Sequence, residues 1–512
     1  MRVPTTYKRI FCTLLSLLLA LSTVACSAKT QADTSAVLNL YGVPSFIKEG
    51  KTSFPWLYIS VTNFCYRTLF ITEADDTGIY SDLVKEYEIS DDRLRYSLTL
   101  KDDLIWSDDE TLDLDDVVFS MESVLKTDQV NSMFSTTFSY IKGAEEYMKG
   151  EAGSISGLVR DGERLHIELE KPMYSFLAIL AQFAILPEHA LNIVPISEIH
   201  NCDFWLDPVV SGMYKRGEHV PNEYLTYAYN ENYGGVMPEI KTLLMRSDFA
   251  LEEIDYTTTS NVEQILSYRS IPSMKEYDVS AVFYRYLLFK DVKNGIVDPV
   301  MNDPNLRKAI LHAIDTESIL NHVYYSSGSL LNKNSETYNL EEAKRILEEV
   351  GYDFNRPLVI LTPFVDSVSI DLIEAIAGDL EKVGFTVTPI FGGNIYNDSY
   401  DIALNDLSAI DEFQWYMEFD QTNALRQNNF ADAEAFDVLI DELLATTNEE
   451  ERAEKINELE LLSNDLVYKF PLLTMNHKAY INKYKIAVPS TLVFGNARYR
   501  YNMHMEDWIF VS

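Results

Sequence analysis

The chain has 512 residues, which at roughly 150 residues per domain allows about three domains. Apolar residues make up 47% and charged residues 24%, proportions that are ordinary for a globular protein and exclude a disordered or fibrous chain. The 79 Asp and Glu against 42 Lys and Arg give a formal net charge of −37. So acidic a surface repels phosphate backbones, and we expect no nucleic-acid partner.

The N-terminal segment is typical of a secretory signal. A basic start precedes an apolar run over residues 10–20, which is shorter than the roughly 20 residues that a membrane-spanning helix needs. The sequence S-T-V-A-C over residues 22–26 resembles a bacterial lipobox, with Thr23 where Leu is usual. We therefore expect Cys26 to be lipidated and the protein to lie on the extracellular face of the bacterial cell membrane, or in the periplasm. Plain secretion, with Cys26 incidental, is the alternative.

Apolar periodicity predicts alternating strands and helices along the rest of the chain. Strict alternation over residues 94–100 indicates a half-buried strand, and apolar residues at helical spacing after Asp113 indicate a helix that Asp113 caps. In chain order we expect strands at 37–42 and 94–100, a helix at 114–125, a strand at 165–169, helices at 175–183, 305–322 and 340–350, a strand at 358–362, a helix at 370–383, strands at 385–390 and 401–404, and helices at 436–445 and 449–466. The alternation between 340 and 404 predicts a mixed or parallel α/β sheet.

Motifs of catalysis and of metal binding do not occur in the sequence. It contains no H-E-x-x-H, G-x-S-x-G, P-loop or G-x-G-x-x-G, and its eight His are scattered. The acidic residues of 108–116 have the composition of a calcium loop but lack its Gly and closing Glu, so they predict a turn and a helix cap. We expect a protein that is not an enzyme and has no cofactor and no metal; an acidic extracellular hydrolase is the alternative from another class.

Several blocks resemble, in the same order, those of the family 5 extracellular solute-binding proteins, the peptide-, dipeptide- and nickel-binding components of ABC importers. The blocks are S-D-L-V-K-E-Y-E-I-S-D-D at 81–92, W-S-D-D-E at 106–110, D-V-V-F-S at 116–120, I-K-G-A-E-E-Y at 141–147, L-E-K-P at 169–172, I-L-P-E-H-A-L at 185–191, P-V-V-S-G-M-Y at 208–214, L-R-K-A-I at 306–310, A-I-D at 313–315 and E-A-K-R-I-L at 342–347. Val210 and Met213 depart from the family's Gly and Pro.

The resemblance implies an α/β, two-lobed fold like that of the type II periplasmic binding proteins, with three domains and a hinge. The expected parts are a signal peptide of 1–25, a lipidated tether of 26–36, a discontinuous domain I of 37–61, 206–284 and 476–512, an inserted domain II of 62–205, and a domain III of 285–475 that forms the opposite lobe. Cys65 and Cys202 lie at the two ends of the inserted domain, where the resemblance makes a disulfide sensible; two buried thiols are the alternative.

The resemblance also implies a ligand site between the lobes. In the family's peptide binders an Asp of the opposite lobe takes the peptide's α-ammonium; Asp411 is the best match here and Asp406 the second, with an ordinary surface Asp as the alternative. Ser211 and Gly212 match a loop near the ligand, or form a plain tight turn. Trp415 lines the cleft or packs in the core.

We therefore expect a monomeric protein that captures a short peptide, or another small solute, and delivers it to the permease subunits of an ABC transporter. Its contact with the membrane would be through the lipid anchor only. A metal chelate, an oligosaccharide or a signalling peptide is the alternative ligand within the same fold.

Overall fold

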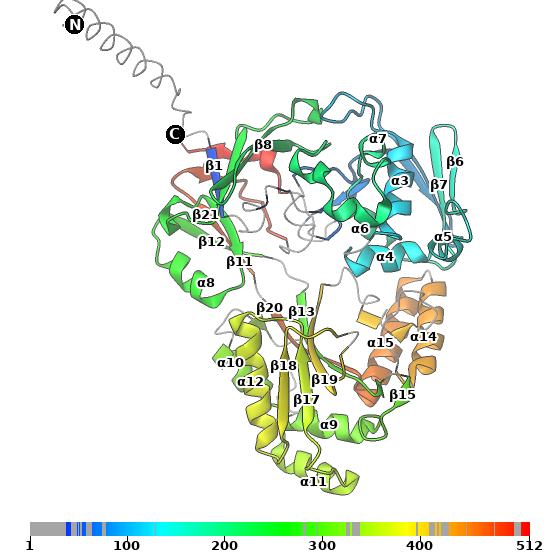
Figure 1. Cartoon of the computed structure of the whole chain (residues 1–512), viewed down its shortest axis with the longest axis vertical. Coiled ribbons are helices and arrows are strands. Elements are labelled where there is room, and N and C mark those ends of the chain that lie inside the picture. The colour runs from blue at the N-terminus through cyan, green and yellow to red at the C-terminus, as the bar shows by residue number, and fades with distance from the viewer. Residues whose placement is uncertain are drawn as a thin grey trace, which may run out of the picture.

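The computed structural model describes residues 37–41, 49, 51, 54–57, 64–73, 78–127, 130–279, 283–293, 295–323, 328–329, 338–395, 398–408, 415–416, 419–420, 430–446, 448–475, 477–495 and 503–511. These residues form an upper and a lower lobe (Figure 1). Cys26 and Asp411 lie outside the described residues.

A seven-stranded mixed sheet forms one side of the upper lobe. Its order is β12 (Met274–Asp278), β21 (Lys478–Asn482), β11 (Tyr256–Thr259), β1 (Val37–Tyr41), β10 (Thr242–Arg246), β9 (Tyr224–Tyr229) and β8 (Tyr214–Val220). β1 runs parallel to β10 and β11, and the other pairs are antiparallel. The sheet therefore joins the N-terminal, central and C-terminal parts of the chain. Smaller elements beside it are η4 (Glu231–Tyr233), η5 (Leu251–Glu253), α8 (Val262–Arg269), β22 (Ile486–Ala487), η7 (Met505–Asp507) and β23 (Ile509–Phe510).

The other side of the upper lobe is a four-stranded antiparallel sheet with short helices against it. The sheet order is β4 (Val84–Ile89), β5 (Arg95–Leu100), β7 (Arg164–Glu168) and β6 (Leu158–Asp161). The remaining elements are β2 (Phe70–Thr72), β3 (Ile79–Ser81), α3 (Leu114–Val124), α4 (Ser132–Ser139), α5 (Ala144–Met148), α6 (Phe176–Leu180), α7 (Glu188–Leu191), η2 (Ile196–Asn201) and η3 (Asp203–Leu206).

The acidic segment before α3 is a turn and a helix cap, as predicted. Asp113 is the N-cap, and its side chain accepts a hydrogen bond from the amide of Asp115. The carboxylate of Asp116 is buried, and it accepts hydrogen bonds from the indole of Trp106 at 3.0 Å and from the amide of Glu188 at 2.8 Å. Asp116 therefore ties helix α3 to the turn before it and to α7.

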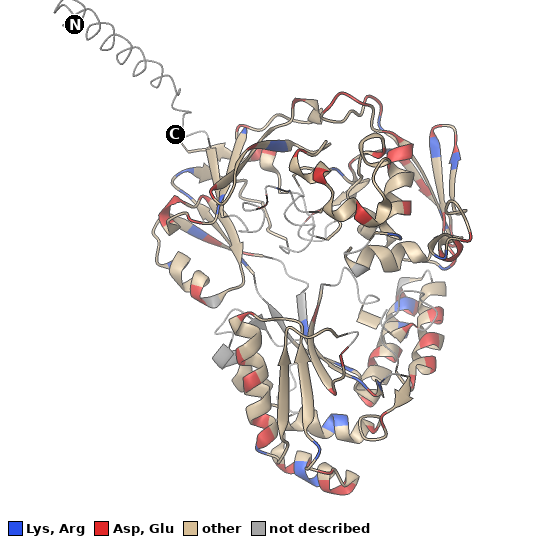
Figure 2. Cartoon of the chain, viewed as in Figure 1, with Lys and Arg blue, Asp and Glu red and all other residues tan. Residues whose placement is uncertain are grey.

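The lower lobe has a six-stranded sheet with helices packed around it. The sheet order is β16 (Gly328–Ser329), β20 (Lys469–Met475), β13 (Phe283–Phe289), β19 (Ile402–Ser408), β17 (Leu358–Thr362) and β18 (Val387–Phe391). β17 is parallel to β18 and to β19, which confirms the prediction for residues 340–404. The helices are α9 (Pro304–Ala313), α10 (Thr316–Val323), α11 (Leu340–Val350), α12 (Ser367–Glu381), α14 (Ala433–Ala445) and α15 (Glu449–Leu466), and β14 (Val292–Lys293) pairs with β15 (Ile296–Val297). Figure 2 shows acidic residues spread over these helices.

The single helix expected at 305–322 was wrong, because the chain breaks it into α9 and α10. Ile314 has an extended backbone (φ −92°, ψ 117°), so the first helix ends there. Asp315 then accepts a hydrogen bond from the amide of Ser318 at 2.9 Å, which starts the second helix, and its own amide donates to Asp379 at 2.8 Å. A capping side chain inside an apolar periodic run thus overrode the periodicity. Among the described residues, no helix combines the length and the apolar character that crossing a bilayer requires.

A network of two carboxylates and two cations, centred on the buried side chain of Asp401, lies at the start of β19. Asp401 is 2% exposed and contacts Lys293 at 2.5 Å and Arg356 at 2.6 Å; Arg356 also contacts Asp298 at 2.7 Å. Burial by itself raises the pKa of Asp298, but hydrogen bonds from Arg356, from the amide of Val300 and from Lys293 outweigh burial and lower the pKa to about 2.

This pKa predicts a specific dependence of stability on pH. An unfolded Asp has a pKa of about 3.9, so ionised Asp298 stabilises the fold above about pH 4 and loses that effect as the pH falls toward 2. The thermal midpoint of Asp298→Asn should lie below that of wild type at pH 7. The difference between the two midpoints should shrink as the pH falls from about 4 to about 2. Asp371 lies on an exposed position of α12, so the thermal midpoint of Asp371→Asn should match that of wild type at every pH. A constant offset between Asp298→Asn and wild type at every pH would contradict the prediction.

Candidate ligand-binding cleft

Two strand segments cross side by side from the upper lobe to the lower lobe. β12 and β21 are antiparallel neighbours in the upper sheet, and the strands that continue them, β13 and β20, are antiparallel neighbours in the lower sheet. Between the sheets the amide of Val279 donates a hydrogen bond to the carbonyl of His477 at 3.2 Å. Two short adjacent crossings are the geometry of a hinge, since few residues need to change backbone angles for one lobe to rotate against the other.

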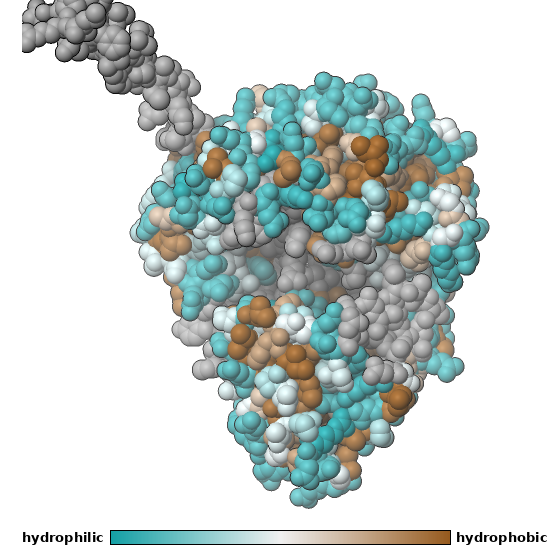
Figure 3. Space-filling view, in the orientation of Figure 1, coloured by the Kyte–Doolittle hydropathy of each residue, from teal (hydrophilic) through white to brown (hydrophobic). Residues whose placement is uncertain are grey.

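The surface is hollowed between the two lobes (Figure 3). β13 enters the lower lobe at Phe283, so that end of the strand lies nearest the upper lobe. β19 is antiparallel to β13 and pairs Ser408 with Phe283, and β17 is parallel to β19. The carboxyl ends of β17 and β19 therefore lie at the edge of the lower sheet that faces the upper lobe, whereas Asp401 lies at the opposite end of β19.

Asp406 lies near this cleft-facing edge, directly across the strand pair from Arg285. Arg285 is 4% exposed, its Nη1 donates to Ser369 Oγ at 2.7 Å, and its guanidinium lies 4.4 Å from the ring centre of Phe364. A carboxylate with a guanidinium as its cross-strand neighbour offers less net negative charge to an incoming ammonium. Asp406 and Asp411 both stay predictions as partners of a ligand ammonium, with Asp411 the better match to the family.

Trp415 packs against the strands of the lower lobe. Its ring lies 5.2 Å from that of Tyr286 on β13, and the ammonium of Lys469 on β20 lies 4.2 Å from the indole. Lys469 is 3% exposed and donates to the carbonyl of Trp415 at 2.9 Å. These contacts support the packing interpretation of Trp415. Arg285 and Lys469 were not predicted from the sequence, where each is a single cation in an otherwise apolar strand.

Ser211 and Gly212 hydrogen-bond their own loop to the backbone of residues 65–67. Ser211 is 2% exposed, and its Oγ accepts a hydrogen bond from the amide of Arg67 at 2.9 Å. The amide of Gly212 donates to the carbonyl of Cys65 at 2.8 Å, and a Cβ at Gly212 would lie 2.5 Å from the backbone of Phe64 and Cys65. Only Gly fits so close an approach. The geometry supports the tight-turn alternative rather than a direct contact with ligand.

The structure has Cys65 and Cys202 as thiols, which supports the alternative of two unlinked cysteines. Cys65 is 1% exposed, whereas Cys202 is partly exposed and its Sγ donates to the carbonyl of Ile199 at 3.4 Å. Both thiols lie near Tyr66, whose pKa is raised first by burial and then by Cys65, Tyr227 and Cys202. The ends of the expected inserted domain thus lie close together without a covalent link.

Three contacts join the lobes on the side away from the crossing strands. The hydroxyl of Tyr140 in the upper lobe donates to Asp420 in the lower lobe, and both residues are buried. Lys171 contacts Asp441 of α14 at 2.5 Å, and the guanidinium of Arg452 on α15 lies 4.4 Å from the ring of Tyr174. We call these contacts the cross-lobe clasp. They can form only when the lobes are closed against each other.

Comparison with known proteins agrees with this architecture. The family model for "Bacterial extracellular solute-binding proteins, family 5 Middle" matches residues 78–424, more than half of the chain. An ABC transporter peptide-binding protein of Brucella ovis is 25% identical over 361 residues, 66% of this chain and 64% of that protein. The oligopeptide-binding protein OppA of Lactococcus lactis is 23% identical over 305 residues, 51% of this chain and 50% of that protein. The chain thus spans just under two thirds of the Brucella relative and half of OppA.

Solved structures of similar fold cover almost the whole chain. The oligopeptide-binding protein AppA of Bacillus subtilis, in complex with a nonapeptide, has a TM-score of 0.72 at 18% identity and covers 93% of this chain and 99% of its own. NikZ of Campylobacter jejuni, in complex with Ni(L-His), has a TM-score of 0.70 at 19% identity with the same coverage. The chain belongs to the family 5 bacterial extracellular solute-binding proteins. The expected α/β fold of type II binding proteins is confirmed; the exact boundaries of its three domains stay a prediction.

The clasp predicts how lobe closure depends on Tyr140. A hydrogen bond to a charged group contributes about 1.5–3 kcal/mol, so Tyr140→Phe should shift the equilibrium between closed and open lobes about 10- to 150-fold toward the open form. Small-angle X-ray scattering of the protein without added ligand should show a larger radius of gyration. Lys171→Ala is the matched control, because an exposed pair contributes less than about 1 kcal/mol. An unchanged radius in Tyr140→Phe would mean that the clasp does not hold the lobes.

Proposed function

We propose that this protein is a lipid-anchored, extracellular solute-binding protein that captures a short peptide between its lobes and delivers it to the permease of an ABC transporter. The observation that carries the proposal is the family match over residues 78–424 on a chain whose two lobes are joined by two crossing strands. A fold of this kind encloses a ligand by rotating one lobe against the other. The proposal treats the chain as a monomer that uses no cofactor and performs no catalysis.

The names of relatives support a peptide as the ligand. The Brucella and Lactococcus relatives are named as peptide-binding and oligopeptide-binding proteins, and the similar AppA structure holds a nonapeptide. A second candidate ligand is a metal chelate, because NikZ, of similar fold, was solved with Ni(L-His). A third kind of small solute is represented by AgaA of A. tumefaciens, of similar fold, which was solved with agropinic acid.

Native mass spectrometry of protein purified without refolding would identify a retained ligand directly. A bound peptide mass, released on denaturation, is the expected result. Calorimetric titration with that peptide should give one site per chain, and incubation should leave the peptide intact. A retained chelate or sugar would replace the peptide in the proposal, and cleavage of the peptide would favour a hydrolase.

The resemblance assigns the peptide's ammonium to Asp411, and this can be tested by substitution. Removing one partner of a buried charge pair costs about 2–5 kcal/mol, so Asp411→Ala should weaken binding of a free-amine peptide about 30- to 5,000-fold. An N-acetylated peptide, which has no ammonium, should bind wild type and variant with similar affinity. Asp406→Ala is the control, since Asp406 has Arg285 as its cross-strand neighbour. If Asp406→Ala has the large effect and Asp411→Ala none, the role passes to Asp406.

The lipid anchor depends on Cys26. If Cys26 is the lipidated residue, Cys26→Ser should release the protein from the membrane fraction into the medium or the periplasm. Fractionation followed by immunoblotting measures this, with Cys12→Ser as the control, because Cys12 lies within the segment expected to be removed. Retention of the Cys26→Ser protein on membranes would contradict the lipoprotein assignment.

A further inference from the structure

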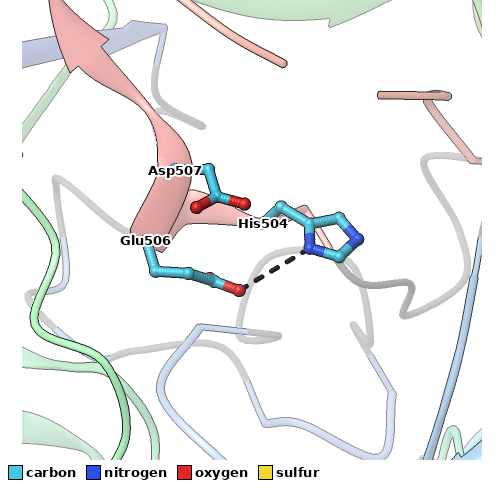
Figure 4. A group of neighbouring side chains, drawn as sticks. All are labelled: His504, Glu506 and Asp507. Atoms are coloured by element: carbon cyan, nitrogen blue, oxygen red, sulfur yellow. Dashed lines mark ion pairs between the residues drawn. The ribbon is translucent and has the colours of Figure 1, made fainter. Parts of the chain in front are cut away.

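One histidine and three carboxylates gather in the upper lobe, in a group that the proposed function does not use. Glu506 and Asp507 belong to the turn η7 near the C-terminus, and His504 directly precedes it. The ligand atoms of these three residues lie within 4.8 Å of one another (Figure 4). The fourth residue, Glu73, directly follows β2 and lies more than 400 positions earlier in the chain; its Oε2 is 2.9 Å from His504 Nε2.

The two ring nitrogens of His504 face different carboxylates at different distances. Nε2 lies at hydrogen-bond distance from Glu73, and the tautomer protonated on Nε2 can donate to that carboxylate. In that tautomer Nδ1 can bind a metal ion, and it lies 3.6 Å from Glu506 Oε1. In Figure 4 the carboxylates of Glu506 and Asp507 both lie on the Nδ1 side of the ring. The ligand atoms of these three residues are thus close enough to bind one cation, which would offset the charge of the two carboxylates.

The 3.6 Å separation fits a shared metal ion. Zinc binds His nitrogen and carboxylate oxygen at about 2.0–2.2 Å in tetrahedral geometry, which places two of its ligand atoms about 3.4 Å apart. Metal-binding histidines also regularly donate their second ring N–H to a carboxylate, which fixes the tautomer and orients the ring. Glu73 occupies that position relative to His504, and it comes from a different part of the chain than the three ligand residues.

We propose that His504 Nδ1, Glu506 and Asp507 bind a divalent cation of the zinc type, with Glu73 as the positioning residue for His504. Nitrogen together with carboxylate oxygen is a donor set that suits Zn²⁺ better than Ca²⁺ or Mg²⁺. This site is separate from the proposed cleft function, and it does not depend on which solute the cleft binds. The bound ion would fix the C-terminal turn η7 against the segment that follows β2.

The test is a titration of the purified protein, without a histidine tag and after treatment with a chelator, with Zn²⁺ alone. We expect one Zn²⁺ per chain, a rise in the thermal midpoint, and visible absorption bands when Co²⁺ replaces Zn²⁺. His504→Asn should weaken Zn²⁺ binding at least 10-fold and abolish the Co²⁺ bands. Asn is chosen because His504 has a left-handed backbone (φ 47°), which Asn tolerates. Glu73→Gln should weaken binding about 10- to 100-fold, the usual effect of changing such a positioning carboxylate.

His189→Asn is the matched control. His189 also pairs with a single carboxylate, Asp108, at 3.0 Å in the upper lobe, and in the described part of the chain the two do not belong to a group of three metal-binding side chains. This variant should bind Zn²⁺ like wild type. Equal affinities for wild type and His504→Asn would place the ion elsewhere, in the cleft or on the acidic surface, and would overturn the proposal, as would the absence of Zn²⁺ binding. If His504→Asn fails to fold, Glu73→Gln decides the question by the same titration.

Discussion

The paired crossing of two strands between the lobes is the constraint on which the rest of the structure depends. Because β12 continues into β13 and β20 continues into β21, the pairing in one sheet fixes which strands are neighbours in the other. The carboxyl ends of β17 and β19 then necessarily face the upper lobe. The location of the cleft therefore follows from backbone pairing, before any side chain is considered.

Asp401 and Asp406 lie toward opposite ends of β19, and their surroundings differ accordingly. Asp401 and Asp406 both belong to one short segment, yet Asp401 begins it at the far end, where Lys293 and Arg356 neutralise it. Asp406 lies at the cleft-facing end with Arg285 across the strand pair. The carboxylate of Asp401 is stable in its buried position because it is paired with two cations, whereas Asp406 is only half-buried and lies where a ligand can approach.

The lobes are not separate hydrophobic units. One core cluster runs from the upper lobe through Tyr140 to Phe419 and Phe436 near helix α14, whereas a second cluster fills the space between the lower sheet and helices α9 to α12. The same cluster contains Tyr286 and Ala403 of the lower sheet, so the helices of the clasp share one core with both lobes. Closure brings apolar surface together as well as the polar pairs, so the clasp is not held by charge alone.

Much of the fold could be predicted because local chemistry and global packing agree. The helix cap at Asp113, the end of α11 at Gly351 and the parallel strands between 340 and 404 all followed from spacing and turn residues. The break at Asp315 was missed, because an apolar period of 3.6 continues through it while a capping carboxylate stops the helix. The site was harder to predict. Ser211 hydrogen-bonds to the backbone of Arg67 inside the upper lobe, and the neighbours of Asp406 and Trp415 come from strands more than 50 residues away in the sequence. Spacing in sequence carries no information about such partners.

The place of β21 in the upper sheet governs when that sheet can be completed. β21 lies between β11 and β12, so these two strands stay apart until residues 478–482 have been synthesised. Sheets that depend on such distant pairing form late and slowly. Nearly the entire chain must therefore be synthesised before the strands of the upper sheet can pair in their final order.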